Sequence, residues 1–407
     1  MPPEPELRFL DRKTPPHLLT LILLAGLSAL SMNIFLPSLP NMTAHFGTDY
    51  RLMQLSVALY LAMNAVLQLA IGPISDRYGR RPVLLVSIWL FLIATLGCLL
   101  APNAAVFLAF RMAQAVIVTG MVLSRAVVRD MVEDARAASM IGYVTMGMAL
   151  VPMIGPVIGG VLDQAFGWQA SFAMLLVAGV LVLVLTWADL GETAPRRGAS
   201  LGEQVRQYPV LFRSRRFWGY ALAAGFASGA FFAYLGGAPF VGSEVFGLNP
   251  AALGLYFGIV ALGYVGGNFL AGRYSVRVGI NRMILYGTLV AGAAPVISMG
   301  LIGLGLGHPL AFFGVMVLVG LGNGMTLPNA TAGMLSVRPH LAGTASGLGG
   351  AIMIGGGAGL SALAGALLVP GRGAWPLLAI MLATSLLAVV SVLYVRRIDR
   401  LEGPPGM

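Results

Sequence analysis

The chain has 407 residues, of which 58% are hydrophobic and only 10% are charged, and its mean hydropathy is +0.86. A soluble domain carries about 25% charged residues, so this composition excludes an ordinary water-soluble fold and favours a surface that faces lipid. The single cysteine, Cys98, excludes an internal disulfide framework and any multi-cysteine metal site. The net charge of +10 raises the possibility of nucleic-acid binding, which the positions of the charges must decide.

Twelve segments are long and apolar enough to cross a bilayer, since a span needs about 20 mostly apolar residues. The first lacks a clear A-x-A cleavage site near its end, so we interpret it as a retained helix rather than a signal peptide. In chain order, the predicted spans are 17–38, 51–73, 82–101, 104–127, 138–162, 168–188, 217–241, 250–272, 281–305, 309–334, 342–368 and 374–395.

A longer, arginine-rich connection separates the sixth predicted span from the seventh. We therefore predict an all-α membrane protein with 12 transmembrane helices in two pseudo-symmetric six-helix bundles. The first bundle comprises residues 1–190, a cytoplasmic linker comprises 191–216, and the second bundle comprises 217–407.

The basic residues indicate the orientation in the membrane. With the N-terminus inside, the outer loops contain only Arg51 and Arg372, and Arg111 lies within a span. All other lysines and arginines then lie on the inner side, as the positive-inside rule requires. Both termini are therefore predicted to be cytoplasmic, and the basic pI reflects topology rather than nucleic-acid binding.

The loop after span 2 carries the most specific motif, G-P-I-S-D-R-Y-G-R-R from Gly72 to Arg81. The loop after span 8, Gly267 to Gly279, also begins with glycine and contains an Arg-Tyr pair, which suggests a duplicated chain. The first loop resembles the loop 2–3 signature of the major facilitator superfamily. We expect a gate in which Asp76 caps or faces a helix end and the arginines pair with acids across the two halves. The gating residues of this loop are Gly72, Asp76, Arg77, Gly79, Arg80 and Arg81; the alternative is a solvated basic loop that only sets topology.

Span 4 places Arg111, Gln114, Val118, Val122 and Arg125 on one helical face. An arginine near mid-membrane costs roughly 3 kcal/mol on insertion scales, and such residues usually face the bundle interior. Arg111 resembles the span 4 arginine of proton-linked exporters, which implies a place in the substrate or proton pathway beside Gln114. The alternative is a structural arginine held by backbone carbonyls. At the inner end we expect Arg125, Arg129 and Asp130 to form a gate or an anchor.

Span 5 reads G-P-V-I-G-G from Gly155 to Gly160. It resembles the G-P-x-x-G-G motif of superfamily antiporters, although Val151 stands where a glycine is expected. Pro156 bends the helix, and Gly155, Gly159 and Gly160 permit close contact with the other half, so we expect this motif to seal the outer contact between halves. The alternative is generic close packing of helices.

Several motifs together resemble the Bcr/CflA drug-exporter family over nearly the whole chain. They are Leu36–Pro40, Gln54, Gly72–Pro82, Arg125–Asp130, Gly167-Trp168, Pro328–Thr331 and Ala342–Ser346. The resemblance implies a monomeric multidrug or antibiotic efflux transporter of the bacterial inner membrane. It would exchange a small lipophilic or cationic drug-like substrate for protons by alternating access.

One position departs from the family pattern: Asn33 stands where the family usually has a span 1 aspartate. An asparagine takes up no proton in the physiological range, and no acid or histidine of the sequence lies deep in a span. Any proton coupling must then use end-of-helix acids such as Asp130 or Asp163. A proton-independent facilitator or uniporter therefore remains an alternative, and a receptor or scaffold without transport is a second.

Polar residues at helical spacing mark a candidate cavity, which would suit a lipophilic drug. In spans 2, 7 and 8 they are Tyr60, Asn64, Gln68, Tyr234, Tyr256, Tyr264 and Asn268, and we add Asn33 to this set. The alternative is packing and hydrogen bonding between helices. No catalytic constellation, metal-ligand cluster or phosphate-binding loop is found in the sequence, so we expect neither an enzyme nor a cofactor.

Overall fold

The computed structural model describes residues 9–131, 154–194, 208–338, 341–369 and 371–402, together with Met140, Val144 and Val151. All regular structure in these ranges is helical. In chain order the helices are α1 (Leu18–Asn33), η1 (Leu36–Ser38), α2 (Leu39–His45), α3 (Tyr50–Tyr78), α4 (Arg80–Leu99), α5 (Ala104–Gln114), η2 (Ala115–Ile117), α6 (Val118–Met131), α8 (Gln169–Asp189), α10 (Arg215–Phe240), η3 (Val241–Val245), α11 (Pro250–Val278), α12 (Ile280–Gly303), η4 (Leu310–Gly314), α13 (Val317–Val337), α14 (Ala342–Leu367) and α15 (Trp375–Glu402). A further helix, Ile154–Phe166, lies between α6 and α8.

Eleven stretches of the described chain are long and apolar enough to cross a membrane, and Ile154–Phe166 is a shorter apolar helix. The eleven stretches confirm eleven of the twelve predicted spans. The first part of the predicted fifth span, 138–162, lies largely outside the described residues. Within the described chain, the predicted fold of two bundles of membrane helices is therefore found.

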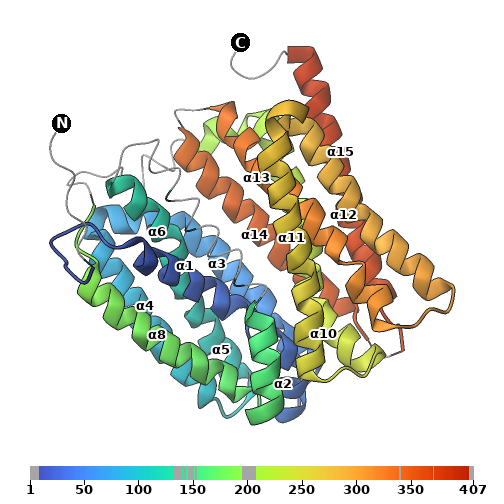
Figure 1. Cartoon of the computed structure of the whole chain (residues 1–407), viewed down its shortest axis with the longest axis horizontal. Coiled ribbons are helices and arrows are strands. Elements are labelled where there is room, and N and C mark those ends of the chain that lie inside the picture. The colour runs from blue at the N-terminus through green and yellow to red at the C-terminus, as the bar shows by residue number, and fades with distance from the viewer. Residues whose placement is uncertain are drawn as a thin grey trace.

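The helices form two groups, one from α1 to α8 and one from α10 to α15 (Figure 1). Within each group the helices pack on one another, and the principal contact between the groups is that of α3 with α14. Further contacts join η1 and α2 of the first group to α10 of the second. The domain boundaries at 190 and 216 stay predictions, because much of the predicted linker lies outside the described residues.

The helices α3 and α11 show how closely the two halves repeat. Both have 29 residues and both begin after a side-chain cap, at Asp49 and Asn249. Both end at a glycine with nearly the same backbone, φ 95° and ψ 150° at Gly79 and φ 89° and ψ 145° at Gly279. Residues that differ by 200 in number are therefore structurally equivalent in these two helices.

This equivalence shows which residues of the loops after spans 2 and 8 correspond to one another. The Arg77-Tyr78 pair corresponds to Arg277 and Val278, whereas Arg273-Tyr274 lies one helical turn earlier. The two Arg-Tyr pairs therefore do not occupy equivalent positions, because the glycine that turns the chain sets the register. At φ near 90° and ψ near 150° the backbone is accessible essentially only to glycine.

We call the end of the molecule at Gly79 and Gly279 the arginine-rich end, and the end at Asp49 and Asn249 the arginine-poor end. At the arginine-rich end, Arg77 lies near the turn at Gly79, and Arg277 and Arg282 lie near the turn at Gly279. The two names carry no assignment to a side of the membrane.

The backbone at Gly279 generates a testable prediction. The Gly279→Ala variant should lose roughly 1–3 kcal/mol of unfolding free energy, because the strain lies in the backbone and no neighbour crowds the site. Thermal unfolding of the purified protein measures this loss. The matched control is Gly272→Ala in the same helix, which also has open space and should be neutral or stabilising. Equal unfolding temperatures for the two variants would contradict the prediction.

Candidate functional site

Arg111, near the end of α5, is the largest side chain that is fully buried in the described chain. Its guanidinium donates to the Ser31 carbonyl at 2.9 Å, to Ser31 Oγ at 3.3 Å and to Gln114 Oε1. It also lies over the rings of Phe35 and Tyr60, with Cζ 4.3 and 4.0 Å from the centroids. The charge is thus held by carbonyls, hydroxyls and aromatic faces, which attract a cation through their quadrupoles.

Every one of these contacts of Arg111 is uncharged. Asn33 is fully buried and donates to the Ala29 carbonyl of its own helix at 2.8 Å. Asn33 Oδ1 is buried and has no hydrogen-bond partner among the described residues. An aspartate at this position would supply a negative charge in the same bundle, whereas the contacts of Arg111 in the described chain include no carboxylate.

Span 4 is not one continuous α-helix. The 3-10 turn η2 separates α5 from α6 directly after Gln114, which donates to Thr95 Oγ1 at 2.8 Å. The predicted single face therefore divides. Arg111 and Gln114 face the first bundle, whereas Arg125 interacts electrostatically with Tyr264 of α11 in the second.

A polar contact joins the two halves at the arginine-poor end. Gln54 of α3 is fully buried and donates to the Ser361 carbonyl of α14 at 2.7 Å and to Ser361 Oγ at 2.8 Å. One turn earlier, the Tyr50 hydroxyl donates to the Gly236 carbonyl of α10 at 2.9 Å. Sequence reasoning did not include this contact among the site residues. A polar Gln54 near a span end and a serine among the α14 glycines were the available signals.

A second contact between the halves is made by the glycine motif of helix Ile154–Phe166. A Cβ on Gly160 would collide with the Pro250 carbonyl, and a Cβ on Gly254 would collide with the Pro156 carbonyl. Gly159 is equally close to the Ile34 carbonyl within the first half. Gly155 lies against Leu30 and Asn33. Gly160 and Pro156 thus contact the backbone of the second half, whereas Gly155 and Gly159 contact span 1 of their own half. A sealing role for the motif stays a prediction.

The arginines at the start of α4 bind groups of their own half. Arg80 forms ion pairs with Asp76 of α3 and with Asp130 of α6, the latter at 3.1 Å. The Arg81 guanidinium donates to the carbonyls of Leu190 and Trp187. The expectation that these arginines pair with acids across the two halves is wrong for this structure. The turn at Gly79 folds α4 back beside α3, which puts both arginines over helix ends of the first half.

Glu192 completes this network and was missed by sequence reasoning. Its carboxylate accepts from the backbone amides of Arg80 at 2.8 Å and Arg81 at 3.3 Å, so it caps the first turn of α4. Glycine is required at Gly79 because of its φ of 95°, and a Cβ there would also displace the Glu192 carboxylate. Its position in the predicted linker gave no signal of this role.

Three other predicted gating residues, Arg77, Arg129 and Gly72, have different surroundings. Arg77 is exposed and lies over the ring of its neighbour Tyr78, with Cζ 5.4 Å from the centroid. Arg129 is exposed, and Gly72 has open space around its Cα.

The predicted cavity residues fall into separate groups. Tyr60 belongs to the Arg111 cluster, whereas Gln68 donates to Asn64 Oδ1 at 2.9 Å and lies close to Gly350 of α14. Tyr234 and Tyr256 pack in an aromatic cluster of the second half, where each contacts the ring of Phe313. Asn268 donates to the Tyr264 carbonyl of its own helix.

The comparisons with known proteins define the family. The family model of the Major Facilitator Superfamily matches residues 21–360. The chain is 32% identical to the chloramphenicol resistance protein of Pseudomonas aeruginosa, over 93% of this chain and 90% of that protein. It is also 32% identical to multidrug resistance protein D of Escherichia coli, over 89% of this chain and 91% of that protein. A crystal structure of the peptide transporter POT in complex with sulfate superposes with a TM-score of 0.79 at 16% identity, over 95% and 96% of the two chains.

The chain is therefore a membrane transporter by class, and it belongs to the major facilitator superfamily. This confirms the resemblance drawn from the motifs. The family match also supports the predicted twelve-helix fold.

The glycine contact generates a second prediction. The Gly160→Ala variant should open the arginine-poor end, because its methyl group meets the backbone of Pro250, which no side-chain rotation relieves. Overpacking costs about 1–3 kcal/mol, so the open population should rise roughly 5- to 150-fold. Labelling of Ala251→Cys in a Cys98→Ser background by an impermeant maleimide measures the opening. The Gly359→Ala control, which has open space, should leave the labelling rate unchanged; equal rates in both variants would refute the role.

Proposed function

We propose that this chain is a drug efflux transporter that works by alternating access. The observation that carries the proposal is the fully buried Arg111 cluster in a chain of this family whose relatives include a chloramphenicol resistance protein and a multidrug resistance protein. The tight contacts of Gln54 and Gly160 support a state closed at the arginine-poor end. Separation of these contacts would expose the centre to the other side.

The proposed orientation places the arginine-rich end and both termini in the cytoplasm of a bacterium, with the chain in the inner membrane. The support is the positive-inside rule applied to the basic loops. The closed arginine-poor end then faces outward. The loop network of Asp76, Arg80 and Asp130 lies at the cytoplasmic gate, where it would fix the ends of α3, α4 and α6 relative to one another.

The electrostatics of the first half favour one class of substrate over another. Arg111 carries a positive charge whose contacts are all uncharged, and Asn33 adds no negative charge. A cationic drug near this cluster would be repelled in a medium of low dielectric constant. We therefore propose a lipophilic substrate that is uncharged or anionic, with aromatic side chains such as Tyr234 and Tyr256 in contact with its apolar surface.

The experiment that tests this function is uptake into proteoliposomes. Chloramphenicol, which is uncharged, should accumulate in proteoliposomes that contain the protein and not in empty liposomes. Tetraphenylphosphonium, a lipophilic cation, should accumulate much less. No protein-dependent movement of any drug-like probe would overturn the proposal, and preference for the cation would overturn the substrate class.

Arg111 provides the sharpest test of the site. Arg111→Lys should reduce chloramphenicol transport by about tenfold or more. An ammonium cannot reproduce the two hydrogen bonds of the guanidinium to Ser31 or its stacking on Phe35 and Tyr60. The exposed Arg51→Gln serves as the control and should transport normally. Uptake and unfolding temperature are measured together. A folded Arg111→Lys or Arg111→Ala protein that transports like the unmodified chain would show that the arginine is only structural.

We propose that transport is coupled to proton movement through Asp163. Its carboxylate is buried at the arginine-poor end, where Oδ2 accepts from Asn41 Nδ2 at 3.0 Å and Ser38 is a second polar neighbour. Asp163 thus connects helix Ile154–Phe166 to α2, which directly follows α1 and η1 in the chain. Protonation would remove the charge that favours this contact and so favour opening. A uniporter remains the second candidate, favoured by Asn33.

Asp163→Asn distinguishes coupling from facilitation. In proteoliposomes that are acidic inside, the unmodified protein should concentrate chloramphenicol, and nigericin should abolish this accumulation. Asp163→Asn should lose the accumulation and keep exchange of labelled for unlabelled drug. The exposed Glu244→Gln at the same end is the control and should behave normally. Equal accumulation with and without the pH gradient in the unmodified protein would favour the uniporter.

A further inference from the structure

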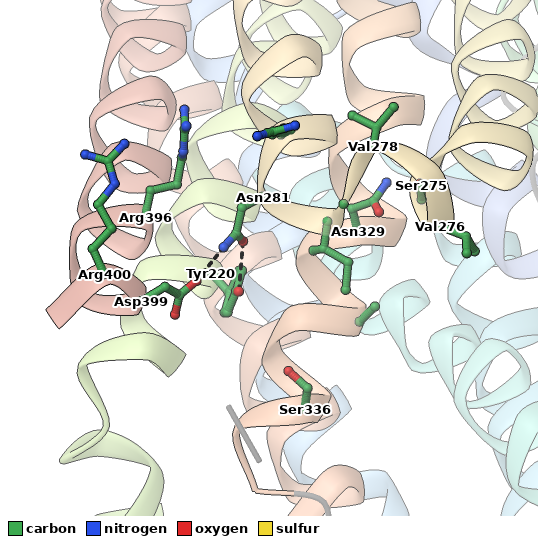
Figure 2. A pocket seen from close by; sticks show the side chains of 14 residues that line it. Tyr220, Ser275, Val276, Val278, Asn281, Asn329, Ser336, Arg396, Asp399 and Arg400 are labelled. Carbon is green, nitrogen blue, oxygen red and sulfur yellow. Dashed lines mark hydrogen bonds between the residues drawn. The ribbon is translucent and has the colours of Figure 1, made fainter. Parts of the chain in front are cut away.

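The second half contains a cavity of about 810 Å³ at the arginine-rich end. Residues of α10, α11, α12, α13 and α15 line it, so it lies among the helix ends of one half rather than between the halves (Figure 2). Its polar lining includes Arg282, Arg396, Arg400, Asn281, Asn329 and Ser275. None of these residues belongs to the transport site described above.

The repeat shows what occupies the equivalent place in the first half. There Arg80 donates to Ser75 Oγ and forms ion pairs with Asp76 and Asp130. The carboxylate of Glu192 caps the free amides of Arg80 and Arg81. The first half thus fills this position with its own cation and places an anion on the start of α4.

The second half lacks those groups. With an offset of 200, Arg80 corresponds to Ile280 and Asp76 to Val276, which is 94% exposed. Ser275, equivalent to Ser75, has a buried Oγ without a hydrogen-bond partner in the described chain. Gly279, the residue before α12, has no side chain that could cap the first amides of that helix. The Ser275 hydroxyl, whose equivalent binds Arg80 in the first half, is therefore left without a partner in the described chain beside the cavity.

The charge at the cavity favours an anion. Asp399 is the only described acid that lines it, and its carboxylate binds Arg216 Nε at 3.2 Å and the Asn281 amide. The Tyr220 hydroxyl donates to Asn281 Oδ1 at 2.8 Å and orients that amide toward Asp399 (Figure 2). Arg282, Arg396 and Arg400 then leave an excess of positive charge next to the start of α12, a position where helix amides bind phosphates.

We propose that this cavity binds the phosphate of an anionic phospholipid from the leaflet at the arginine-rich end. Val276, which lines the cavity, is 94% exposed, and Tyr274, next in sequence to the lining residue Ser275, is 38% exposed, so acyl chains would cover apolar surface here. Basic pockets between membrane helices bind anionic headgroups in this way. A free phosphate shares the headgroup chemistry and lacks the acyl chains, so an experiment separates the two sources.

The experiment titrates the purified full chain in detergent with phosphatidylglycerol, phosphatidylcholine or inorganic phosphate, and follows bound lipid by native mass spectrometry together with the unfolding temperature. Phosphatidylglycerol should bind about tenfold or more tightly than phosphatidylcholine, because only its headgroup carries a net negative charge. Equal binding of both lipids would overturn the proposal. Stabilisation by inorganic phosphate without a lipid preference would make the cavity a free-anion site and would also overturn it.

Two variants locate the binding. Arg282→Gln/Arg396→Gln/Arg400→Gln should lose the preference for phosphatidylglycerol, whereas the control Arg273→Gln/Arg277→Gln/Arg397→Gln removes the same charge from exposed arginines that do not line the cavity and should keep it. The double variant Val276→Asp/Ile280→Arg gives the second half the residue types that Asp76 and Arg80 provide in the first half. It should fill the cavity and abolish the preference without removing any arginine. Retention of the preference by this variant would contradict the site even if the triple variant failed to fold.

Discussion

The backbone contact between the two halves at the arginine-poor end is the constraint on which the rest of the structure depends. In lipid, apolar surface gives little drive for helices to associate, so the halves must be joined by close packing and hydrogen bonds. The repeat uses both means at equivalent positions. Gln54 of α3 binds Ser361, and its counterpart Gly254 of α11 lies against the Pro156 backbone. One side of the contact is polar and the other is a contact between backbones.

The two kinds of contact differ in how they would separate. A hydrogen bond such as that of Gln54 to Ser361 can be exchanged for one to water when the contact opens. The glycine contact gains from van der Waals proximity alone and loses that energy within a fraction of an ångström. The halves are thus held together by many weak contacts. In the described chain, Arg80 and Arg81 form no ion pair with the second half. Such a contact suits a transporter that must open and close repeatedly.

The buried charge of Arg111 and the inner network of Arg80 show two different electrostatic solutions. Arg80 is neutralised by Asp76 and Asp130 at a helix end. Arg111 is held by Ser31, Gln114 and two aromatic faces, without a carboxylate among these contacts. Asn33 is central to this difference, because an aspartate there would introduce a negative charge in the same bundle as Arg111, whose described contacts include no carboxylate. The proposals of an uncharged or anionic substrate and of proton coupling through Asp163 both depend on the presence of Asn33 instead of an aspartate.

Much of the architecture could be predicted from the sequence because membrane spans are defined by length and hydropathy, which are local properties. The burial of Arg111 followed from the cost of a charge in lipid, and the close approach at Gly160 followed from the glycine spacing. Partners distant in sequence could not be predicted. Glu192 caps α4 although it lies 112 residues after Arg80, and Ser361 binds Gln54 although the two are 307 residues apart. The residue-by-residue correspondence of the two halves also could not be predicted, because it depends on the backbone angles of Gly79 and Gly279, which the sequence does not reveal.

The measurement that tests the account most directly is double electron–electron resonance between spin labels on the two halves. In a Cys98→Ser background, one pair at Arg77 and Arg277 reports the arginine-rich end, and one pair at Arg51 and Glu244 reports the arginine-poor end. All four positions are exposed. The account predicts that chloramphenicol under an imposed pH gradient lengthens one distance as it shortens the other. Distances that stay fixed at both ends, or that change in the same direction, would contradict alternating access around the contact of Gln54 and Gly160.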